Sequence, residues 1–371
     1  MLRHQLLEFS QEAEEAFVAA KSAIAESTKG LPDAVRVLAV TEGATIDSHI
    51  AIRGKAANRG KVVPRRLPVA MCGEDQAPVG GSGRWELAER LLNDSNPFTA
   101  RVEVNRLWHH LFGRGLVPTV CDFGEMGQPP SHPELLDWLA EDFRRHGWSR
   151  KRMIRQMVLS NTYQMSSVAA DAEKSAEVDP TNKWLHRMSV RRLTAEAIRD
   201  QLLHVSKRLR PEVGGASVNV YLTPFMDGRG KPAGGPRDSD GRRSLYVAIR
   251  RNFLPTDLLA FDFPRPLTSI GTRTRSNVPA QSLFMMNNPL VREQAELTAK
   301  RLLQEDHEAA DRLTALFEAA IGMPPSESQR QECEAFLAQS AKENNVDENA
   351  LKPWSDLCHV VFNMKDFIFL R

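Results

Sequence analysis

The spacing of apolar and polar residues predicts a chain made mostly of helices. The clearest helix covers residues 131–147, where apolar positions recur every three or four residues, basic residues occupy the last turn and Gly147 follows. Ser131 and Glu134 have the spacing of a capping box at its start. Further helices are expected at residues 1–28, 82–93, 96–112, 149–159, 193–209 and 279–304, and in the remaining C-terminal segment.

Extended segments are few and short. Residues 35–40 and 49–54 predict two strands joined by a polar turn. Residues 244–251 predict a third strand, with Leu245, Val247 and Ile249 on one face. The expected fold class is therefore α+β, predominantly α-helical with a small antiparallel β element.

A stretch rich in Gly, Pro and charged residues, 54–83, predicts a boundary between two regions. Residues 1–83 would hold the N-terminal helix, the short β segment and a linker. Residues 84–371 would form a mainly helical domain. A second Gly- and Pro-rich stretch, 211–243, predicts a long loop inside that domain.

Composition excludes several classes of function. The chain has 49 basic and 47 acidic residues, a balance too even to predict nucleic acid as its partner. No apolar run approaches the roughly 20 residues of a transmembrane helix, and the N-terminal segment has acidic residues where a signal peptide needs an apolar stretch. The four cysteines form no CxxC or CxxCH spacing, so we expect no c-type haem attachment and no metal site in this chain. Their disulfide state stays open.

Two adjacent histidines, His109 and His110, lie near the end of the helix expected at 96–112. Successive helical residues differ by about 100°, so the two imidazoles diverge too far to bind one metal comfortably. One interpretation makes His109 a half-buried, hydrogen-bonded residue and His110 an exposed one. The alternative makes His109 a contact for a haem carried by another domain.

A polar stripe recurs every four residues in the helix expected at 193–209. It consists of Arg192, Glu196, Asp200, His204 and Arg208. The two carboxylates and the imidazole have the chemistry of an acid/base or metal site. The alternative is a solvent-facing ladder in which arginines neutralise the carboxylates, because neighbouring cations weaken metal affinity.

A second polar group lies between residues 246 and 288. It includes Arg250, Arg251, Asp262 and Arg273. The planar guanidinium groups of the arginines can recognise carboxylates, phosphates, sulfates or sugar hydroxyls in a polar cleft. Buried arginine–aspartate pairs that lock long loops are the alternative. No motif for a phosphate-binding loop, a serine nucleophile or a metalloprotease accompanies either group.

Several segments together resemble one protein family. They are "NPFTARVEVNRLWHHLFGRGLV", "DFGEMGQPPSHPELLDWLA", "RRLTAEAIRDQLL", "RRSLYVAIRRN", "FDFPRP", "VPAQSLFMMNNPLVREQA" and "DLCHVVFNMKDFIFLR". In order and spacing they resemble the C-terminal planctomycete-type domain of unknown function found in secreted bacterial proteins with cytochrome c-like modules. The resemblance covers about residues 90–371. The signal peptide and the haem-binding module of such proteins are not visible here, so the chain resembles a C-terminal part of one.

The resemblance implies an extracytoplasmic location and a cytochrome c-like domain or another extracytoplasmic protein as partner. It implies haem only in modules outside this chain. We expect a non-catalytic interaction or scaffold module. The alternative is a hydrolase or carbohydrate-processing enzyme that uses Glu196, Asp200 or Asp262, and a third hypothesis is a redox partner that uses His109. An enzyme should bring carboxylates and arginines into one pocket, whereas a scaffold should pair them and expose apolar surface.

Overall fold

The computed structural model describes residues 10–30, 38–43, 45–66, 81–305 and 308–370. The chain divides into two compact units, residues 1–96 and 97–371.

The described residues of the smaller unit form the helices α1 and α3 and one pair of strands. Helix α1 (Gln11–Ser27) begins at Ser10, whose hydroxyl accepts a hydrogen bond from the N–H of Ala13. Strand β1 (Ser48–Ala51) pairs antiparallel with β2 (Arg59–Val63), and helix α3 (Arg84–Leu92) follows. A 3-10 turn, Ile52–Gly54, leads out of β1.

The partner of this strand differs from the expected one. Residues 38–40 form no strand, and residues 35–37 lie outside the described residues. Instead Ser48 pairs with Val63, after a short loop that follows Gly54. Residues 59–63 fall in the predicted linker, because the glycine and lysine in this short segment interrupt the apolar pattern that predicts an edge strand. The pairing is local, which favours a hairpin over a longer-range partner.

The larger unit begins with a three-helix layer. It consists of α4 (Phe98–Phe112), α5 (Pro133–Arg145) and α6 (Arg150–Val158). The layer encloses a core whose central aromatic residue, Phe112, stacks on Trp108 at 4.0 Å and meets the ring of Tyr163 edge-on. The predicted capping box of α5 is absent, because Pro133 starts the helix and the residue before it, His132, is the N-cap.

The turn that ends α4 is fixed by a buried asparagine. Gly113 closes the helix with a positive φ of 88°. The Asn105 side chain, fully buried, then accepts a hydrogen bond from the N–H of Val117 at 2.8 Å and donates one to its carbonyl at 3.0 Å. A Cβ at Gly115 would lie 2.5 Å from the carbonyl oxygen of Val117, so only glycine fits this turn.

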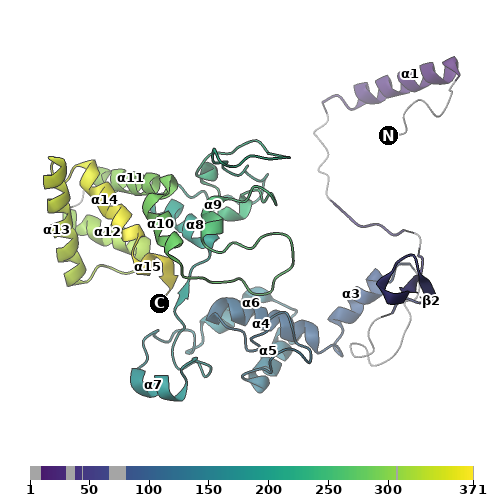
Figure 1. Ribbon diagram of the computed structural model, residues 1–371, viewed down its shortest axis with the longest axis horizontal. Helices are drawn as coiled ribbons and strands as arrows, with labels where there is room; N and C mark the ends of the chain where they lie inside the picture. The colour runs from purple at the N-terminus through teal and green to yellow at the C-terminus, as the bar shows by residue number, and fades with distance from the viewer. Residues whose placement is uncertain (1–9, 31–37, 44, 67–80, 306–307, 371) are drawn as a thin grey trace. The chain divides into compact units, whose positions relative to one another are not determined.

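The second layer of the larger unit is a helical bundle around one apolar core. Its helices are α8 (Ala195–Val205), α9 (Thr256–Ala260), α10 (Pro279–Asn287), α11 (Pro289–Gln304), α12 (Ala309–Ile321), α13 (Glu327–Asn344), α14 (Leu351–Phe362) and α15 (Lys365–Ile368). Helices α11 and α14 lie side by side, with α13 on the outer side of the bundle (Figure 1). Trp354, Phe317 and Phe362 are at most 2 % exposed in this core, and burial of each such side chain contributes roughly 2–3 kcal/mol.

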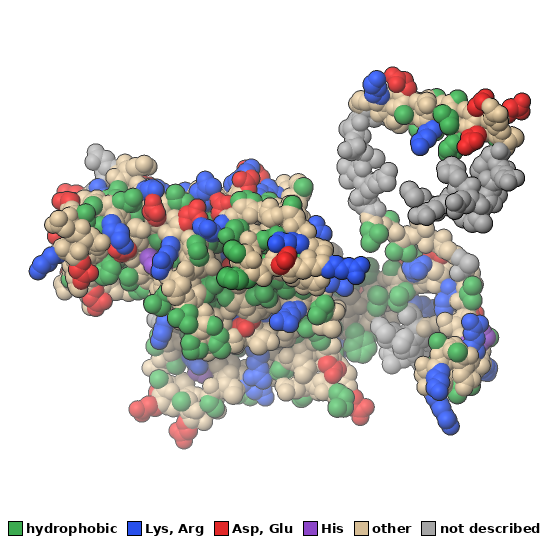
Figure 2. All heavy atoms as spheres, turned by 45° about the horizontal axis from the view of Figure 1, so that its top comes forward, with side chains coloured by type: hydrophobic (Ala, Val, Ile, Leu, Met, Phe, Trp, Pro, Cys, Tyr) green, Lys and Arg blue, Asp and Glu red, His purple; other side chains and the backbone are tan. Residues whose placement is uncertain are grey.

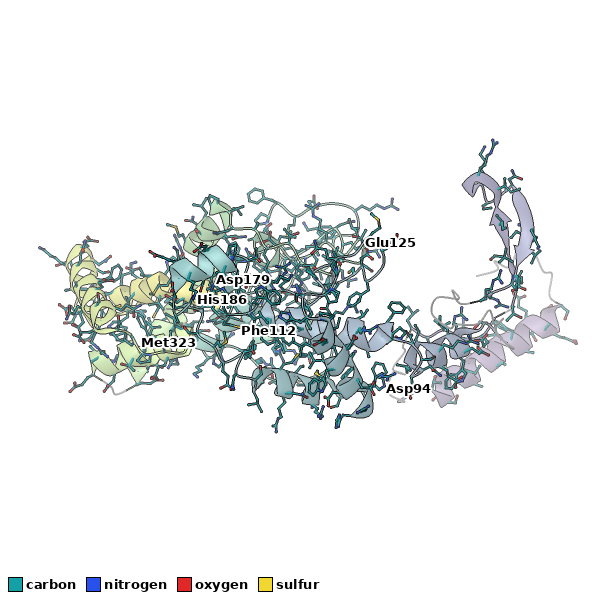
Figure 3. All side chains as sticks on the ribbon, turned by 90° about the horizontal axis from the view of Figure 1, so that it is seen from below. Asp94, Phe112, Glu125, Asp179, His186 and Met323 are labelled. Atoms are coloured by element: carbon teal, nitrogen blue, oxygen red, sulfur yellow. The ribbon has the colours of Figure 1, made fainter. Side chains whose placement is uncertain are left out.

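The two layers are joined by a segment with little regular structure. It carries the short helix α7 (Ala172–Val178) and a tight loop in which Asp179 accepts hydrogen bonds from the N–H groups of Lys183 and Trp184. The ring of His186 lies against the same loop, within 3.3 Å of the Asp179 carbonyl oxygen (Figure 3). Strand β3 (Arg191–Arg192) follows and pairs antiparallel with β4 (Phe369–Leu370) at the end of the chain.

The strand expected at residues 244–251 is not formed. Ser244–Tyr246 is a 3-10 turn, and Leu245 is 76 % exposed whereas Val247 is buried. The N–H of Ser244 donates to the side chain of Asp200 and is not available to a neighbouring strand. Further along, the segment forms only isolated bridges, such as the one between Val218 and Val247, in which the N–H of Ala248 donates to the carbonyl of Val218. A second 3-10 turn, Ser239–Gly241, precedes it.

The expected fold class is confirmed. The chain is predominantly α-helical, with small antiparallel strand pairs at residues 48–63 and between β3 and β4. Among the described helices, none combines the length and the apolar character needed to cross a membrane.

Candidate functional site

The candidate residues of the predicted stripe do not all lie on one helix. Helix α8 begins after Thr194, whose hydroxyl accepts a hydrogen bond from the N–H of Ala197, and it ends at Val205. Arg192 therefore lies in β3, before the helix, and Arg208 lies beyond it, where it pairs with Asp238 at 2.8 Å. Only Glu196, Asp200 and His204 share a face of α8, because the N-cap at Thr194 and the turn after Val205 shorten the expected helix.

Arg192 and Asp262 form a buried ion pair. The Arg192 side chain, 5 % exposed, donates from Nη2 to Oδ2 of Asp262 at 2.7 Å and from Nη1 to the carbonyl of Ser276 at 2.8 Å. Ser276 donates its N–H and hydroxyl to the same carboxylate. Burial by itself raises the pKa of Asp262, but the donors of Ser276 and the Arg192 guanidinium outweigh it and lower that pKa. The Asp262 carboxylate is thus fully engaged in contacts that fix the segment 262–276.

Glu196 forms an ion pair with Arg273, near the other end of the segment 262–276. Its Oε2 lies 2.7 Å from Nη1 of Arg273. Burial raises the pKa of Glu196, and the hydrogen bond from Arg273 more than compensates, so the pKa is lowered. Glu196 is an ionised ion-pair partner rather than a proton donor near neutral pH.

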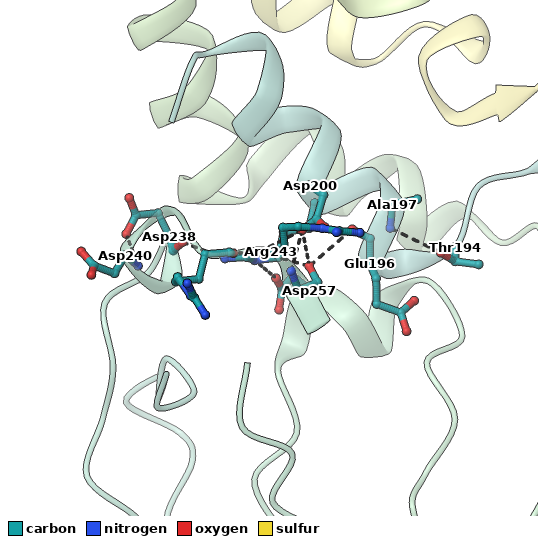
Figure 4. A network of polar contacts seen from close by, with 11 residues as sticks. Thr194, Glu196, Ala197, Asp200, Asp238, Asp240, Arg243 and Asp257 are labelled. Carbon is teal, nitrogen blue, oxygen red and sulfur yellow. Dashed lines mark hydrogen bonds and ion pairs between the residues drawn. The ribbon is translucent and has the colours of Figure 1, made fainter. Parts of the chain in front are cut away.

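Asp200 belongs to a network around a buried arginine (Figure 4). The Arg199 side chain, 3 % exposed, lies 3.3 Å from Asp200 and 3.7 Å from Asp257, and it donates to the carbonyl of Asp238 at 2.7 Å. Asp200 also accepts hydrogen bonds from the N–H and hydroxyl of Ser244, both at 2.7 Å. Burial raises the pKa of Asp257, although the Arg199 charge opposes the rise. The network ties α8 to α9 and to the loop before Ser244.

Three candidate residues stay outside these networks. His204, Arg250 and Arg251 are exposed, and their side chains make no hydrogen bond or ion pair with other described residues. The structure therefore joins Arg273 to Glu196 on α8 and joins Asp262 to Arg192 in β3. It does not bring Arg250 and Arg251 to either pair.

His109 and His110 diverge on α4, with ring centroids 5.5 Å apart. His110 is exposed, as expected, whereas His109 is only 8 % exposed and its buried Nδ1 has no hydrogen-bond partner among the described residues. The expected hydrogen bond of His109 is thus missing at Nδ1. Burial lowers the pKa of both histidines, and the charges of Arg191 and Arg275 lower both further.

The part of the chain that the structure describes holds no group of three or more histidine, cysteine, aspartate or glutamate side chains placed to bind one metal. Cys121, Cys333 and Cys358 are free thiols, and Cys72 lies outside the described residues. Burial raises the pKa of Cys358, which makes it a packing residue and not a nucleophile.

Two cavities lie on the bundle near α10 and α14. One, of about 580 Å³, is lined by Ser282, Met286, Asn287, Arg292, His359, Val360, Asn363 and Met364. The other, of about 320 Å³, shares Ser282 and Asn363 and reaches Arg192 and Lys365. Neither lining contains a carboxylate, and the Nε2 of His359 lies 2.9 Å from the carbonyl oxygen of Met285. The linings therefore offer no carboxylate for acid/base chemistry.

Sequence reasoning missed the central residues of these networks. Arg199 falls on the apolar face of α8, between Ile198 and Leu202. An arginine inside an apolar stripe is the signal that marks a buried cation, since such a charge needs carboxylate partners. Ser276 and Asp257 carry no local signal, because their roles depend on partners 14 and 58 residues distant in the chain.

Comparison with known proteins gives one match. No curated protein and no solved structure is similar to this chain. The family model described as "Protein of unknown function (DUF1553)", named PSD1, matches residues 83–337, which is more than half of the chain. The chain belongs to this family of proteins of unknown function.

Proposed function

We propose that this chain is a non-catalytic interaction module of an extracytoplasmic, cytochrome-associated protein. The observation that carries the proposal is the pairing of every candidate carboxylate. Glu196, Asp200 and Asp262 each lie within 3.3 Å of an arginine nitrogen. A carboxyl group with a lowered pKa and an arginine beside it is a poor proton donor. We infer that Glu196 and Asp262 instead hold the segment 262–276 in place through their ion pairs.

The partner we propose is a cytochrome c-like domain, and the surface is the cavity beside α10 and α14. Met286 and Val360 line it and are 51 % and 45 % exposed. Arg292 lies in the same lining, and the lining has no carboxylate. Such a surface complements an apolar edge bordered by carboxylates, which a haem and its propionates present. Elsewhere, on the face shown in Figure 2, basic and acidic side chains are interspersed over the larger unit, which favours no single-sign partner.

The test is calorimetric titration of the full chain with a purified c-type cytochrome domain. We expect a dissociation constant of about 1–100 µM, typical of small transient interfaces. Met286→Glu should weaken binding by more than about 10-fold, because it places a charge in an apolar contact. Val178→Glu is the matched control, since Val178 is 70 % exposed on α7, outside the cavity lining.

A second arm tests the alternative of a hydrolase. Wild type, Glu196→Gln and Asp262→Asn are incubated with 4-nitrophenyl esters and glycosides. Equal, background-level release in all three supports the proposal. Turnover by the wild type that either variant removes, with the circular dichroism spectrum unchanged, would make the chain an enzyme. Failure of the wild type to bind the cytochrome domain would overturn the proposed partner.

A further inference from the structure

A cluster of cations surrounds the last turn of α4. Arg106 precedes His110 by four residues, which makes the two neighbours on the helix surface. Arg191 reaches the same turn from β3 and donates a hydrogen bond to the carbonyl of His110. Arg275 arrives from the segment 262–276: its Nη1 and the Cδ of Arg191 each lie 3.8 Å from the position that a Cβ of Gly113 would occupy.

The positive charge of this cluster is not compensated within the described residues. Arg106, Arg191 and Arg275 have no carboxylate oxygen within 4.0 Å there, unlike Arg192, Arg199 and Arg273. Burial lowers the pKa of Arg275, and the charges of Arg191 and Arg192 lower it further. Arg106 and Arg275 are exposed and Arg191 is half-buried, so an anion can reach all three. Like charges held close together repel one another, so an anion bound among them relieves an existing cost.

The backbone that presents these cations is fixed before any ligand arrives. Arg191 is in a strand paired with β4, with Arg191 opposite Leu370. Ser276, the neighbour of Arg275, is tied to Asp262 by its N–H at 2.7 Å. Further back in the segment, Gly271 lies so close to Cys121 that a Cβ would be 1.6 Å from its sulfur. A binding site built on such anchors loses little entropy when it captures a ligand.

We propose that Arg106, Arg191 and Arg275, together with His110, bind a tetrahedral oxyanion: the sulfate or phosphate group of a ligand. The cations come from three separate elements and approach from different directions. A single planar carboxylate is saturated by one bidentate guanidinium, whereas a tetrahedral group has oxygens on several sides for several donors. The site is separate from the cavity at α10 and α14, and the inference does not depend on the proposed function.

Protons are linked to this binding. The groups that face His110 are Arg106 and His109 on α4, Arg191 on β3, and Arg273 and Arg275 on the following segment, with Glu196 of α8 paired to Arg273. An anion placed among them favours the protonated form of His110, so its pKa rises on binding. Sulfate does not titrate in this range, and its affinity should increase as the pH falls from 7.5 to 6.

The experiment is a titration of the full chain with sodium sulfate at constant ionic strength, followed by calorimetry and by the NMR signals of the histidine rings. We expect saturable binding that shifts the His110 resonances. Arg275→Gln should weaken binding by about 10-fold or more, because a charge-assisted hydrogen bond is lost. Arg275 makes no hydrogen bond with other described residues, so this variant should keep the fold. Arg250→Gln removes the same charge from an exposed position outside the cluster and should bind as the wild type does.

Two outcomes would overturn the inference. One is equal sulfate affinity in wild type and Arg275→Gln; the other is equal loss in Arg275→Gln and Arg250→Gln, which would show only general charge screening. Titration with inorganic phosphate, a sulfated monosaccharide and a sugar phosphate then separates the sources of the oxyanion. Tighter binding of one ester than of its free ion identifies the class of ligand. Because cytochrome binding is measured at another surface, either proposal can fail while the other holds.

Discussion

At the scale of single residues, the turn after α4 shows how one side chain sets a local fold. Asn105 is fully buried, and it satisfies both backbone polar groups of Val117, twelve residues on. Buried backbone groups without partners are costly, so this single amide decides where the chain turns after Gly113.

Replacement of this amide should destabilise the larger unit. In Asn105→Ala the N–H and carbonyl of Val117 lose their partner in the core, and we expect a loss of about 3 kcal/mol in the free energy of unfolding. Urea denaturation followed by circular dichroism measures it. Asn287→Ala is the control, because Asn287 is exposed and bonds only to the carbonyl of Leu283, one turn earlier in α10. A similar loss in both variants would contradict the role assigned to Asn105.

At the scale of elements, the segment 262–276 owes its course to ion pairs at both ends, with Arg192 at one and Glu196 at the other. Regular structure contributes little to it, since it lies between the short helix α9 and α10 without a strand or helix of its own. Side-chain ion pairs thus take the place of the backbone hydrogen bonds that hold the helices and strands together. Removal of one partner should therefore free the whole segment.

Asp262→Asn tests this tether. The substitution keeps the shape of the side chain but leaves the nearly buried Arg192 without its counter-charge, and we expect a loss of about 3 kcal/mol in unfolding free energy. Amide hydrogen exchange in residues 262–276 should rise more than in α11. Asp137→Asn, which breaks the more exposed pair with Arg101, is the control and should cost less than about 1 kcal/mol. Unchanged exchange in the segment would show that the ion pair does not hold it.

Features of the fold that depend on neighbouring residues can be predicted from the sequence, whereas those that depend on distant partners cannot. Helices such as α5 and α6 were predictable, because their apolar spacing and their ends are local features. The ends of α8 were misplaced, since the cap at Thr194 competes with a periodic pattern that continues past it. Asp262 and Arg273 are polar candidates in the sequence, as are Arg192 and Glu196, but the sequence does not predict which of them pair. Ion pairs across 70 and 77 residues leave no trace in local spacing.

At the scale of the whole molecule, basic and acidic residues are nearly equal in number, and many of them form specific pairs. The chain has a net charge of +2, and several of its carboxylates, such as Asp262 and Asp179, are held by arginines or by backbone N–H donors. The carboxyl groups with lowered pKa values are Glu42, Glu141, Asp142, Asp179, Glu196, Glu212, Asp227 and Asp262. The protein therefore depends on ionised carboxylates for part of its stability.

Stability should fall in two steps as the pH is lowered. His109 and His110 have lowered pKa values in the fold, so the unfolded chain binds more protons below about pH 6.5 and stability begins to fall there. The carboxyl groups stabilise the fold fully above their unfolded pKa values of about 4, and this contribution is lost as the pH falls through their lower folded values. Asp257, whose pKa is raised, acts in the opposite direction, but it is a single group.

Urea unfolding at constant ionic strength from pH 7.5 to pH 3 measures both steps. His109→Gln/His110→Gln should remove the shallow step near pH 6.5 and leave the steep one near pH 4, because only the histidines titrate in the first range. Added sulfate should shrink the first step in the wild type, since an oxyanion beside His110 stabilises its protonated form in the fold. A first step that persists in the double variant would mean that other groups cause it. If the free energy of unfolding does not change between pH 7.5 and pH 3, the ion pairs do not have the role assigned to them.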